Sequence, residues 1–571
     1  MNHNFLVLRR PGIDTYQEPV VYMRSDCDIC RAEGFSSQNR VQVTVGERHV
    51  IATVHMVTSE LLHHDEAGLS EAAWHLLGAT EGEHAHFSHP TPVESMSFVR
   101  GKLYGNRFSE AAARAVIGDI RDGHYSDIQL AAYVTACADA LLDTAETIAI
   151  TRAMVESGQR FDWGRTPVMD KHCVGGLPGN RTTPVVGALA PACGLLMPKT
   201  SSRAITSPAG TADTMETLAP VDLSFERMRR VVEQEGGCIA WGGSVSLSPT
   251  DDIVIRVERA LDLDSEGQLV ASVISKKVAA GATHVLIDMP VGPTAKVRQE
   301  DMARRLTAQL IETGAALGVQ VSVLQTDGTQ PVGRGIGPAL EARDILQVLR
   351  RDAGAPQDLR ERALTLAGAL LELGGVAAPG AGLARATATL DSGTAWEKFR
   401  AICAAQGGMR EPPLSQYQHP VVAERSGVVA HLNMRSLAKA AKLAGAPADP
   451  AAGIEMHVRR GEEVERGQPL YTMHADTRGE LHYALDYLKS HPRRSASRTR
   501  YGEDAARPAR RRARRVPGRT ARMDPRGTRT ARVPGRRVVY PHAVGRGRCR
   551  GHGAGRSRAT ERTRAGTAAG R

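Results

Sequence analysis

The chain is poor in aromatic residues and has no long apolar segment. Phe, Trp and Tyr make up only 4% of its 571 residues, so most of the core volume must come from Ala, Val, Leu and Ile. No apolar run reaches about 18 residues, which argues against a membrane-spanning helix. The N-terminus has neither a basic start nor a long apolar stretch, so we expect no signal peptide. A chain of this length should form several domains.

Cysteine is also sparse. The eight cysteines are scattered and lie mostly in apolar segments, which in a large chain is typical of a reduced, cytoplasmic protein. Cys27 and Cys30 form a single Cys-x-x-Cys pair. A zinc site would need further ligands, and the candidates without diagnostic spacing are His63, His64, His84, His86 and His89. We therefore expect no bound metal, and zinc binding by the Cys27 and Cys30 pair stays an alternative.

Lysine and acidic residues are nearly absent from residues 491–571. This segment holds 25 of the 73 Lys and Arg, all of them Arg, and four of the 62 acids, so it carries +21 and residues 1–490 carry −10. An arginine-rich arm could bind nucleic acid or another polyanion. We favour the alternative that the segment is an out-of-frame translation of a GC-rich gene end, whose codons spell mostly Arg, Ala, Gly and Pro. Either interpretation predicts a disordered tail.

Four regions with different patterns precede this tail. Residues 1–90 alternate as short strands and predict a β-rich domain, whereas residues 95–160, with part of 250–281, predict a small all-helical domain. Residues 161–410 alternate strands, glycine loops and helices, which indicates an α/β domain with a mostly parallel sheet. Residues 420–490 have the pattern of a C-terminal α+β domain.

Helix signals are clear in the second region. Asp143 and Glu146 form a capping-box pattern, which predicts a helix that runs to Gly158. Ser126 is the predicted N-cap of the preceding helix, whose apolar residues share one face at the spacing i, i+3, i+4, i+7.

The α/β region should hold the ligand site at one edge of its sheet. Strands are predicted over residues 167–170 and 195–197, and further along the chain. In an open α/β sheet the ligand lies at the carboxyl ends of the strands. The site should therefore be surrounded by the loops that follow Asp170, Met197, Trp241 and Met289.

A glycine-rich loop, residues 170–183, follows the first of these strands and precedes a predicted helix. Its glycines let backbone N–H groups approach an oxyanion, and the helix N-terminus adds partial positive charge. Lys171 supplies a full charge, and Thr182 and Thr183 supply hydroxyls. The pattern indicates a phosphate cradle, although not a Walker A loop, because the Gly-Lys-Ser/Thr ending is missing. A tight turn alone would explain the glycines but not Lys171 beside His172.

A second polar segment, residues 199–216, follows the next strand. It contains seven hydroxyl residues, one Arg and one Gly. Alone it could equally be a solvated loop that caps a helix beginning near Thr211. Two such loops on successive strands would face each other, which favours a binding site.

These two segments resemble the signature of the thymidine/pyrimidine-nucleoside phosphorylase family. The pattern Ser-x-Arg-Gly/Ala-x-x-x-Thr/Ala-Gly/Ala-Gly-Thr-x-Asp-x-x-Glu departs only at Pro208 and is matched at Ser201, Arg203, Ala204, Ala209, Gly210, Thr211, Asp213 and Glu216. The family's Lys-His-x-x-Gly-Gly loop is matched from Lys171 to Gly176, and its Ser-x-x-Ser-Lys-Lys helix from Ser272 to Lys277. The resemblance covers about residues 95–490. The extra N-terminal domain is similar to that of a longer branch, which includes AMP phosphorylases.

The resemblance implies a role for each matched residue. Phosphate would be held by Lys171, Thr182, Thr183, Ser201 and Thr211. The base would be held by His172, Arg256, Ser272 and Lys276. Nucleotide-contacting positions of the AMP-type enzymes match Gly176, Ser202, Arg203, Ala204, Ile205, Thr206, Ser207, Thr211, Ser272 and Lys296. Asp264 matches their proton donor, so the implied catalytic residues are Asp264, His172 and Lys171, although Asp264 could instead be a solvated loop acid. Cys173 stands where Ser is usual, and a thiol donates hydrogen bonds poorly.

The implied reaction is phosphorolysis of thymidine or another pyrimidine nucleoside to the base and (deoxy)ribose 1-phosphate. The alternative substrate is AMP or another nucleoside 5′-monophosphate, which would give ribose 1,5-bisphosphate; either places the chain in nucleotide salvage. Inorganic phosphate would be the co-substrate and no cofactor is expected. The family is dimeric or larger, so the resemblance implies a homo-oligomer. A phosphoribosyltransferase would need Mg²⁺, and no acidic pyrophosphate-metal motif stands out.

Overall fold

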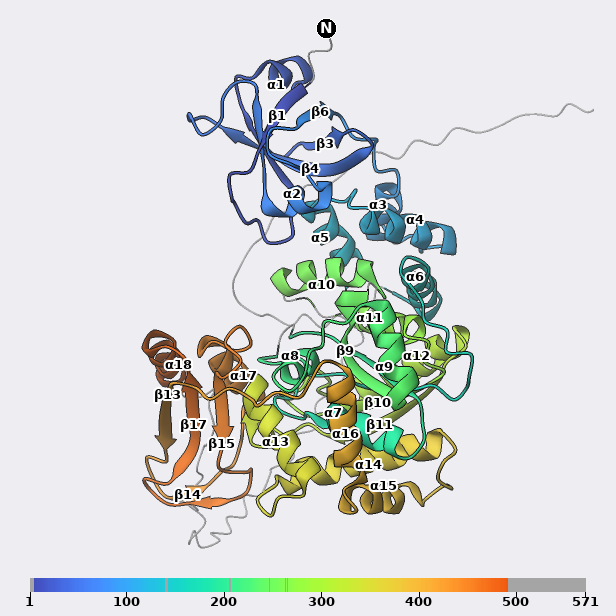
Figure 1. Cartoon of the computed structure of the whole chain (residues 1–571), viewed down its shortest axis with the longest axis vertical. Helices are drawn as coiled ribbons and strands as arrows, with labels where there is room; N and C mark the ends of the chain where they lie inside the picture. Colours follow the sequence, from blue (N-terminus) through green and yellow to red (C-terminus); the bar gives the residue numbers. More distant parts are fainter. Residues whose placement is uncertain are drawn as a thin grey trace, which may run out of the picture. The chain divides into compact units, whose positions relative to one another are not determined.

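The computed structural model describes most of the chain up to Ser490 (Figure 1): residues 5–138, 142–204, 207–245, 247–261, 263 and 265–490. The predictions for residues 491–571 lie outside these described residues, as do those for Ile205, Thr206 and Asp264. The fold class agrees with the sequence prediction in each of the four regions that precede the tail.

The N-terminal region is a closed six-stranded barrel with two short helices, α1 (Asp28–Glu33) and α2 (Glu71–Leu77). The strands are, in barrel order, β1 (Phe5–Arg9), β5 (Glu66–Leu69), β2 (Val20–Arg24), β4 (Arg48–Val57), β3 (Arg40–Val45) and β6 (His84–Ser88). Alternate residues of β3 are buried in the barrel core, as a two-residue side-chain period requires. The predicted β-rich domain is therefore confirmed.

The Cys-x-x-Cys pair has a structural place in this barrel. Cys27 is the N-cap of α1, and its Sγ accepts a hydrogen bond from the backbone N–H of Cys30 at 3.3 Å. Both side chains are buried. Within the described part of the chain, no group of three or more His, Cys, Asp or Glu is arranged to hold a metal ion.

The helical region combines segments that are about 100 residues apart in sequence. Its helices are α3 (Met96–Leu103), α4 (Glu110–Arg121), α5 (Asp127–Ala136), α6 (Thr144–Glu156), α10 (Pro249–Leu261) and α11 (Glu266–Ala279). Val254, Val257 and Ala271 join the same buried cluster as the earlier helices, and α11 packs along α6 (Figure 1). The predicted capping box at Asp143 and Glu146 is confirmed, with α6 beginning at Thr144.

The α/β region contains two parallel sheets that meet edge to edge. One has the order β11 (Gln320–Asp327), β10 (His284–Val291), β7 (Met169–Cys173), and the other pairs β8 (Met197–Ser201) with β9 (Gly237–Trp241). A parallel bridge between Val168 and Leu196 joins them. The helices are α7 (Thr182–Ala192), α8 (Thr211–Glu216), α9 (Phe225–Glu235), α12 (Glu300–Ala316), α13 (Pro338–Arg350), α14 (Gln357–Leu373), α15 (Gly382–Asp391) and α16 (Thr394–Ala405).

Two predicted strand boundaries are wrong. The strands predicted to end at Asp170 and Met197 continue to Cys173 and Ser201. The sequence prediction stopped where apolar residues gave way to charged ones. In the structure these charged residues stay buried because they pair with one another inside the protein, so the strands carry the first residues of both polar motifs.

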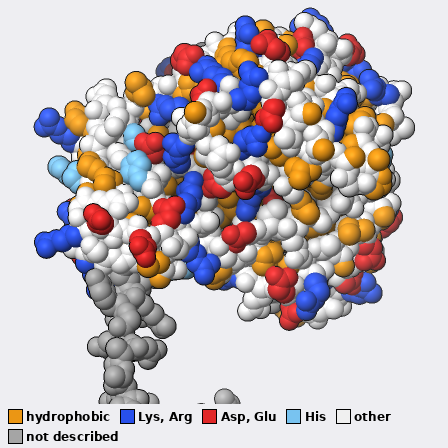
Figure 2. Space-filling model, turned by 90° about the horizontal axis from the view of Figure 1, so that it is seen from below, with side chains coloured by type: hydrophobic (Ala, Val, Ile, Leu, Met, Phe, Trp, Pro, Cys, Tyr) orange, Lys and Arg blue, Asp and Glu red, His pale blue; other side chains and the backbone are white. Residues whose placement is uncertain are grey.

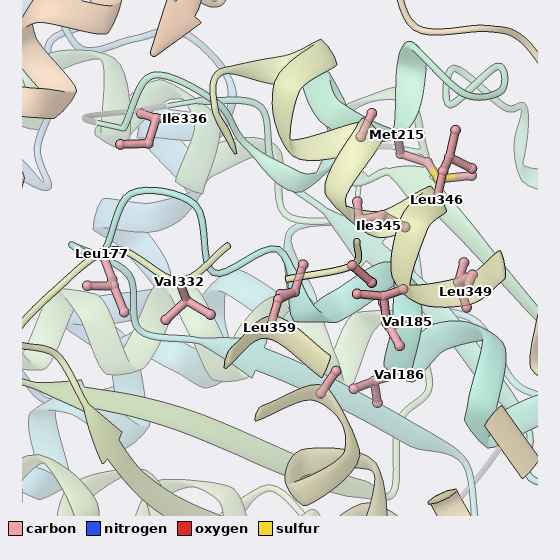
Figure 3. Close-up of a cluster of buried hydrophobic side chains, with 14 of the residues drawn as sticks. Leu177, Val185, Val186, Met215, Val332, Ile336, Ile345, Leu346, Leu349 and Leu359 are labelled. Carbon is pink, nitrogen blue, oxygen red and sulfur yellow. The ribbon is translucent and has the colours of Figure 1, made fainter. Parts of the chain in front are cut away.

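Helix α13 is anchored in the core beside these motifs. Figure 3 shows Ile345, Leu346 and Leu349 of α13 lying against Val185 of α7 and Met215 of α8. All five side chains are buried. Burying a side chain of this kind contributes about 1.5–3 kcal/mol, so the packing fixes α13 firmly relative to the helices that follow the two polar motifs.

The C-terminal region is the predicted α+β domain. An antiparallel sheet of β12 (Gly335–Ile336), β15 (Gly453–Met456), β17 (Pro469–Ala475) and β13 (Tyr417–Val422) is accompanied by a short pair, β14 (Gly427–Val428) and β16 (Glu463–Val464). Its helices are α17 (Met434–Leu443) and α18 (Arg478–Ser490). No helix in the described residues is both long and apolar enough to cross a membrane.

Candidate active site

A cavity of about 280 Å³ lies between the helical region and the carboxyl ends of β7, β8 and β9. Helices α10 and α11 close it from the helical side. Twelve of the predicted site residues line this cavity: Lys171, His172, Gly176, Thr183, Ser201, Ser202, Arg203, Ser207, Thr211, Ser272, Lys276 and Lys296. Residues from three separate motifs therefore meet in one place.

Three other predicted residues do not line the cavity. Thr182 is fully buried behind it and contacts Lys171. The backbone N–H of Ala204 donates to Asp213 at 2.6 Å, which holds the loop before α8. Arg256 lies on the face of α10 that turns toward α5, and it donates to Asp127 at 2.6 Å instead of facing the cavity.

Lys171 sits at the base of the cavity with no solvent exposure. Its Nζ donates to Thr182 Oγ1 at 2.7 Å and to Thr183 Oγ1 at 3.4 Å, and it lies 3.6 Å from Asp288 Oδ2. Each threonine hydroxyl thus accepts a hydrogen bond from the lysine, which leaves its own proton for another acceptor. A buried lysine is stable in this place because the Asp288 carboxylate compensates its charge.

Asp288 is itself held on both oxygens. Asn180 Nδ2 donates to Oδ2 at 3.1 Å, and Thr326 Oγ1 donates to Oδ1 at 2.7 Å. Asn180 belongs to the glycine-rich loop and Asp288 to β10, next to β7 in the sheet. This bond therefore ties the loop to the sheet.

A second charged group lies beside the first. Asp170 pairs with two lysines: Lys199 Nζ donates a hydrogen bond to Oδ1 at 3.0 Å, and Lys277 Nζ forms an ion pair with Oδ2 at 3.0 Å. Both lysines also donate to the backbone carbonyl of Thr200, at 2.7 Å and 3.3 Å. One buried carboxylate thus joins β7, β8 and α11, which are distant in sequence.

The buried groups leave an excess of positive charge at the cavity. Among the described residues, the ion-pair partners of Lys171, Lys199 and Lys277 are two buried carboxylates, Asp170 and Asp288, so one positive charge is left over when all three lysines are protonated. Burial is the main cause that lowers the pKa of Lys199 to about 7, with repulsion from Lys277 adding to it and Asp170 opposing it. An anion in the cavity would relieve this strain, because it would favour the charged forms of the lysines.

The same lysines act on His172. Burial first, and then the charges of the lysines around it, hold the pKa of His172 well below 6.5. The imidazole is therefore neutral at physiological pH. It can donate a hydrogen bond from one ring nitrogen and accept one at the other.

On the α11 side of the cavity, two carboxylates hold the charged side chain of Lys276 in place. Lys276 forms ion pairs with Asp251 and, at 3.6 Å, with Asp252, and Ser272 Oγ donates to Asp251 at 3.0 Å. Burial opposes the charge of Lys276, but the two carboxylates outweigh it and raise its pKa above 10.5. Ser272 and Lys276 lie one turn apart on α11, as the Ser-x-x-Ser-Lys-Lys spacing requires.

Gly176 and Lys296 are packed against each other at the rim of the cavity. A Cβ on Gly176 would lie 2.2 Å from the backbone N of Lys296, and the φ of Gly176 is +79°. Only glycine fits both conditions. Cys173, nearby, accepts a hydrogen bond from Asn180 at 3.4 Å, and burial is the main cause that raises the pKa of its thiol to about 12. The thiol therefore stays neutral.

Sequence reasoning missed the charged residues that support the predicted ones. Lys199, Lys277 and Asp170 all belong to the three polar motifs. The sequence analysis assigns no role to any of them. Asp288 lies in the apolar run His284–Met289, and a charged residue inside such a run is the signal by which the sequence could have indicated it. Arg181, also in the loop, lines the cavity as well.

Family models built from known proteins agree with this architecture. Three sequence models match: the helical bundle domain of the glycosyl transferase family over residues 96–158, its a/b domain over residues 165–396, and the pyrimidine nucleoside phosphorylase C-terminal domain over residues 428–492. A solved structure of anthranilate phosphoribosyltransferase from Thermus thermophilus aligns with 54% of this chain and 98% of its own, at 21% identity and a TM-score of 0.46.

Curated relatives are similar over nearly their whole length. A protein of Hahella chejuensis (strain KCTC 2396) is 64% identical over 489 residues, which is 86% of this chain and 97% of the relative. One from Polaromonas sp. (strain JS666 / ATCC BAA-500) is 63% identical over 485 residues, covering 85% and 95%. Both carry the name "Putative thymidine phosphorylase". As the sequence motifs predict, the chain belongs to the glycosyl transferase family of pentosyltransferases that combines a helical bundle, an α/β domain and a pyrimidine nucleoside phosphorylase C-terminal domain.

Proposed function

We propose that the chain catalyses phosphorolysis of the N-glycosidic bond of thymidine or a related pyrimidine nucleoside. The products would be the free base and (deoxy)ribose 1-phosphate. The name of its relatives and the pyrimidine nucleoside phosphorylase C-terminal domain support this substrate class. Inorganic phosphate is the co-substrate, and the reaction needs no further cofactor.

The observation that carries the proposal is the arrangement of cations behind hydroxyls. Lys171 donates to the hydroxyls of Thr182 and Thr183, and the Thr183 hydroxyl, which lines the cavity, keeps a proton that it can donate into it. With the excess positive charge of the buried lysines, this is a set of donors oriented before an anion arrives. Preoriented donors of this kind lower the barrier for charged transition states, because they need no reorganisation during the reaction.

Two further residues that line the cavity can bind the base as it leaves. Breaking the bond to C1′ leaves an oxocarbenium-like sugar and negative charge on the base. Neutral His172 and charged Lys276 can donate hydrogen bonds to carbonyl oxygens of a pyrimidine. Asp264, which the family pattern assigns as proton donor, could protonate a purine nitrogen. Bound phosphate is the nucleophile, so the protein chiefly positions the reactants.

A second substrate class is favoured by Lys296. This residue lines the cavity and is packed against Gly176, at a position that matches nucleotide contacts of AMP-type enzymes. A cation there could bind a 5′-phosphate. The substrate would then be AMP or another nucleoside 5′-monophosphate, and the product ribose 1,5-bisphosphate.

One experiment separates these proposals. Free base released from thymidine, uridine, AMP, CMP and UMP would be measured by chromatography, with and without inorganic phosphate. Phosphate-dependent release of thymine is the expected result. Release from the monophosphates alone would make the chain a nucleotide phosphorylase, and Lys296→Ala should then weaken nucleotide turnover. No release from any of the five compounds would contradict both proposals.

We further propose that the enzyme works as a cytoplasmic homo-oligomer. Apolar side chains are exposed on α3, on the residue that follows it, and on the neighbouring helix α5: Phe98, Leu103, Tyr104 and Ile128. Tyr104 is 88% exposed and Ile128 73% exposed, and apolar side chains that gather on neighbouring elements are typical of a protein–protein contact. Light scattering on the purified chain should give at least twice the mass of 61.2 kDa, and a monomer would contradict this proposal.

A further inference from the structure

Arg181 is a charged residue of the cavity to which neither the family pattern nor the sequence motifs assign a role. It is the last residue before α7, and its side chain is only 14% exposed. The guanidinium makes three contacts in three directions. It donates to Glu341 at 2.6 Å, to Thr211 Oγ1 at 3.0 Å and to the carbonyl of Ala209 at 2.8 Å.

Glu341 holds Arg181 in one orientation. Its carboxylate is 1% exposed and also accepts from Thr214 Oγ1 at 3.1 Å and from the backbone N–H of Gly337 at 3.3 Å. It lies on α13, one turn before Ile345, which Figure 3 shows in the core beside α7 and α8. A buried carboxylate fixed by a packed helix gives the guanidinium little freedom to rotate.

The contact with Thr211 determines what that hydroxyl can do. Thr211 lines the cavity at the first position of α8. A hydroxyl has one proton and two acceptor lone pairs, and Arg181 occupies one lone pair. The described residues show no acceptor for the Thr211 proton, which is therefore available to an anion in the cavity. Lys171 acts on Thr182 and Thr183 in the same way.

We propose that Arg181 is a positioning residue for the co-substrate phosphate, which orients the hydroxyl of Thr211 as a donor and joins the two polar loops. This inference rests on the proposed function, because phosphate is the anion concerned. It assigns Arg181 an action through Thr211, not a direct contact. Glu341 then also supports the phosphate site, although it is distant in sequence, because it holds Arg181 and Arg181 holds Thr211.

The test compares Arg181→Met with the wild type. Losing one charge-assisted hydrogen bond should raise the KM for phosphate about tenfold while kcat and the KM for the nucleoside change less than about threefold. Calorimetry with inorganic phosphate alone should show the same loss of affinity. The control is Arg360→Met on α14, which breaks an ion pair of similar length (2.7 Å) with the more exposed Asp391 of α15. Neither residue lines the cavity, so both values should stay unchanged.

Arg181→Met leaves Glu341 buried without its partner, so this variant could unfold. The double variant Arg181→Met/Glu341→Gln removes both charges. Its amide oxygen can accept from the Gly337 N–H, and its amide NH2 can donate to the Thr214 hydroxyl, whose own proton has the Gly210 carbonyl as an acceptor. This double variant should have a Tm near that of the wild type and bind phosphate as weakly as the single variant. Wild-type phosphate affinity in the double variant would overturn the inference.

A double-mutant cycle with Thr211→Val decides whether Arg181 acts through Thr211. If it does, Arg181→Met costs little further affinity once the hydroxyl is gone, and the two effects are not additive. Fully additive losses would overturn the inference, because Arg181 would then act on phosphate independently.

Calorimetry with phosphate distinguishes a failure of this inference from a failure of the proposed function. A chain that binds phosphate in this way but cleaves no nucleoside contradicts only the proposed function, and normal turnover with an unchanged KM in Arg181→Met contradicts only this inference.

Discussion

At the scale of single residues, one substitution at Lys171 tests the proposed phosphate site, because this lysine lies at the base of the cavity and contacts two threonine hydroxyls. Lys171→Met removes the cation that orients Thr182 and Thr183, so we expect kcat/KM for phosphate to fall by about 10²–10³, as for loss of a preoriented donor. Steady-state kinetics with varied phosphate measure this change. Lys398→Met is the matched control, because its ion pair with Glu235 (3.0 Å) lies away from the cavity.

The variant also leaves Asp288 buried beside an apolar side chain. Lys171→Met/Asp288→Asn removes this second effect, since the amide can still accept from Thr326. The double variant should unfold at a higher temperature than the single one and be equally inactive. Recovery of activity in the double variant would show that Lys171 serves only to neutralise Asp288.

Lys199 gives a prediction about protons. Burial lowers its pKa to about 7, so above pH 7 the empty site has largely lost this proton. An anion favours the charged lysine and raises its pKa again, so anion binding at pH 8 must take up a proton, whereas at pH 6 the lysine is already charged. Sulfate is a suitable probe because it does not titrate in this range.

Calorimetry with sulfate in two buffers of different ionisation enthalpy measures this uptake. Proton uptake should be clear at pH 8, small at pH 6, and lost at both in Lys199→Met. Equal uptake at the two pH values, or uptake that persists in the variant, would show that another group accepts the proton.

Many residues that line the cavity could be predicted from sequence, but the partners that hold them could not. Lys171, Ser272 and Lys276 stand in motifs with fixed local spacing, which is why the sequence identifies them. Asp288 reaches Lys171 only because β10 pairs beside β7. Local patterns contain no information on which strands become neighbours. The prediction that Arg256 lines the cavity was wrong for the same reason. The side of α10 that faces the cavity depends on how α10 packs against α5, which local patterns do not contain.

At the scale of elements, the glycine-rich loop depends on two adjacent glycines in different ways. Gly175 and Gly176 both have positive φ, but only at Gly176 would a Cβ meet another atom, the backbone N of Lys296 at 2.2 Å. Gly175→Ala should cost about 1 kcal/mol from the backbone conformation alone. Gly176→Ala should cost more and lower activity at least about tenfold, because the loop must move away from Lys296.

The pair of variants forms its own control. Urea unfolding gives the two stabilities, and phosphorolysis assays give the two activities. Similar losses of activity in both variants would mean that the positive φ, and not the contact with Lys296, is what the site requires.

Element boundaries were predicted well where side chains act locally and poorly where burial decides. The capping box at Asp143 and Glu146 marks the start of α6 correctly, since both hydrogen bonds lie within four residues. The ends of β7 and β8 were placed three and four residues early. Charged residues usually end a buried strand, and only the ion pairs with distant partners allow Lys171 and Lys199 to remain inside.

At the scale of the whole molecule, charge is divided between two parts of the chain. Residues 1–490 carry −10, and Figure 2 shows acidic and basic side chains interspersed on the face that it presents. The buried lysines Lys171, Lys199 and Lys277 place further positive charge inside the cavity. We therefore expect no nucleic-acid partner for this part of the chain, and any binding to polyanions should depend on residues 491–571.

A chain that ends at Ser490 tests this division. All described site residues and the last helix, α18, are retained, so we expect phosphorolysis within about twofold of the full chain, the range of a change remote from the site. Binding to a labelled single-stranded oligonucleotide at low salt should be lost, since it would arise from the 25 arginines removed. If the shortened chain kept its oligonucleotide affinity, the positive charge responsible would have to lie on the body. If it lost phosphorolysis while keeping its Tm, the arginine-rich segment would have to contribute to the reaction, and the active site would be incomplete within residues 1–490.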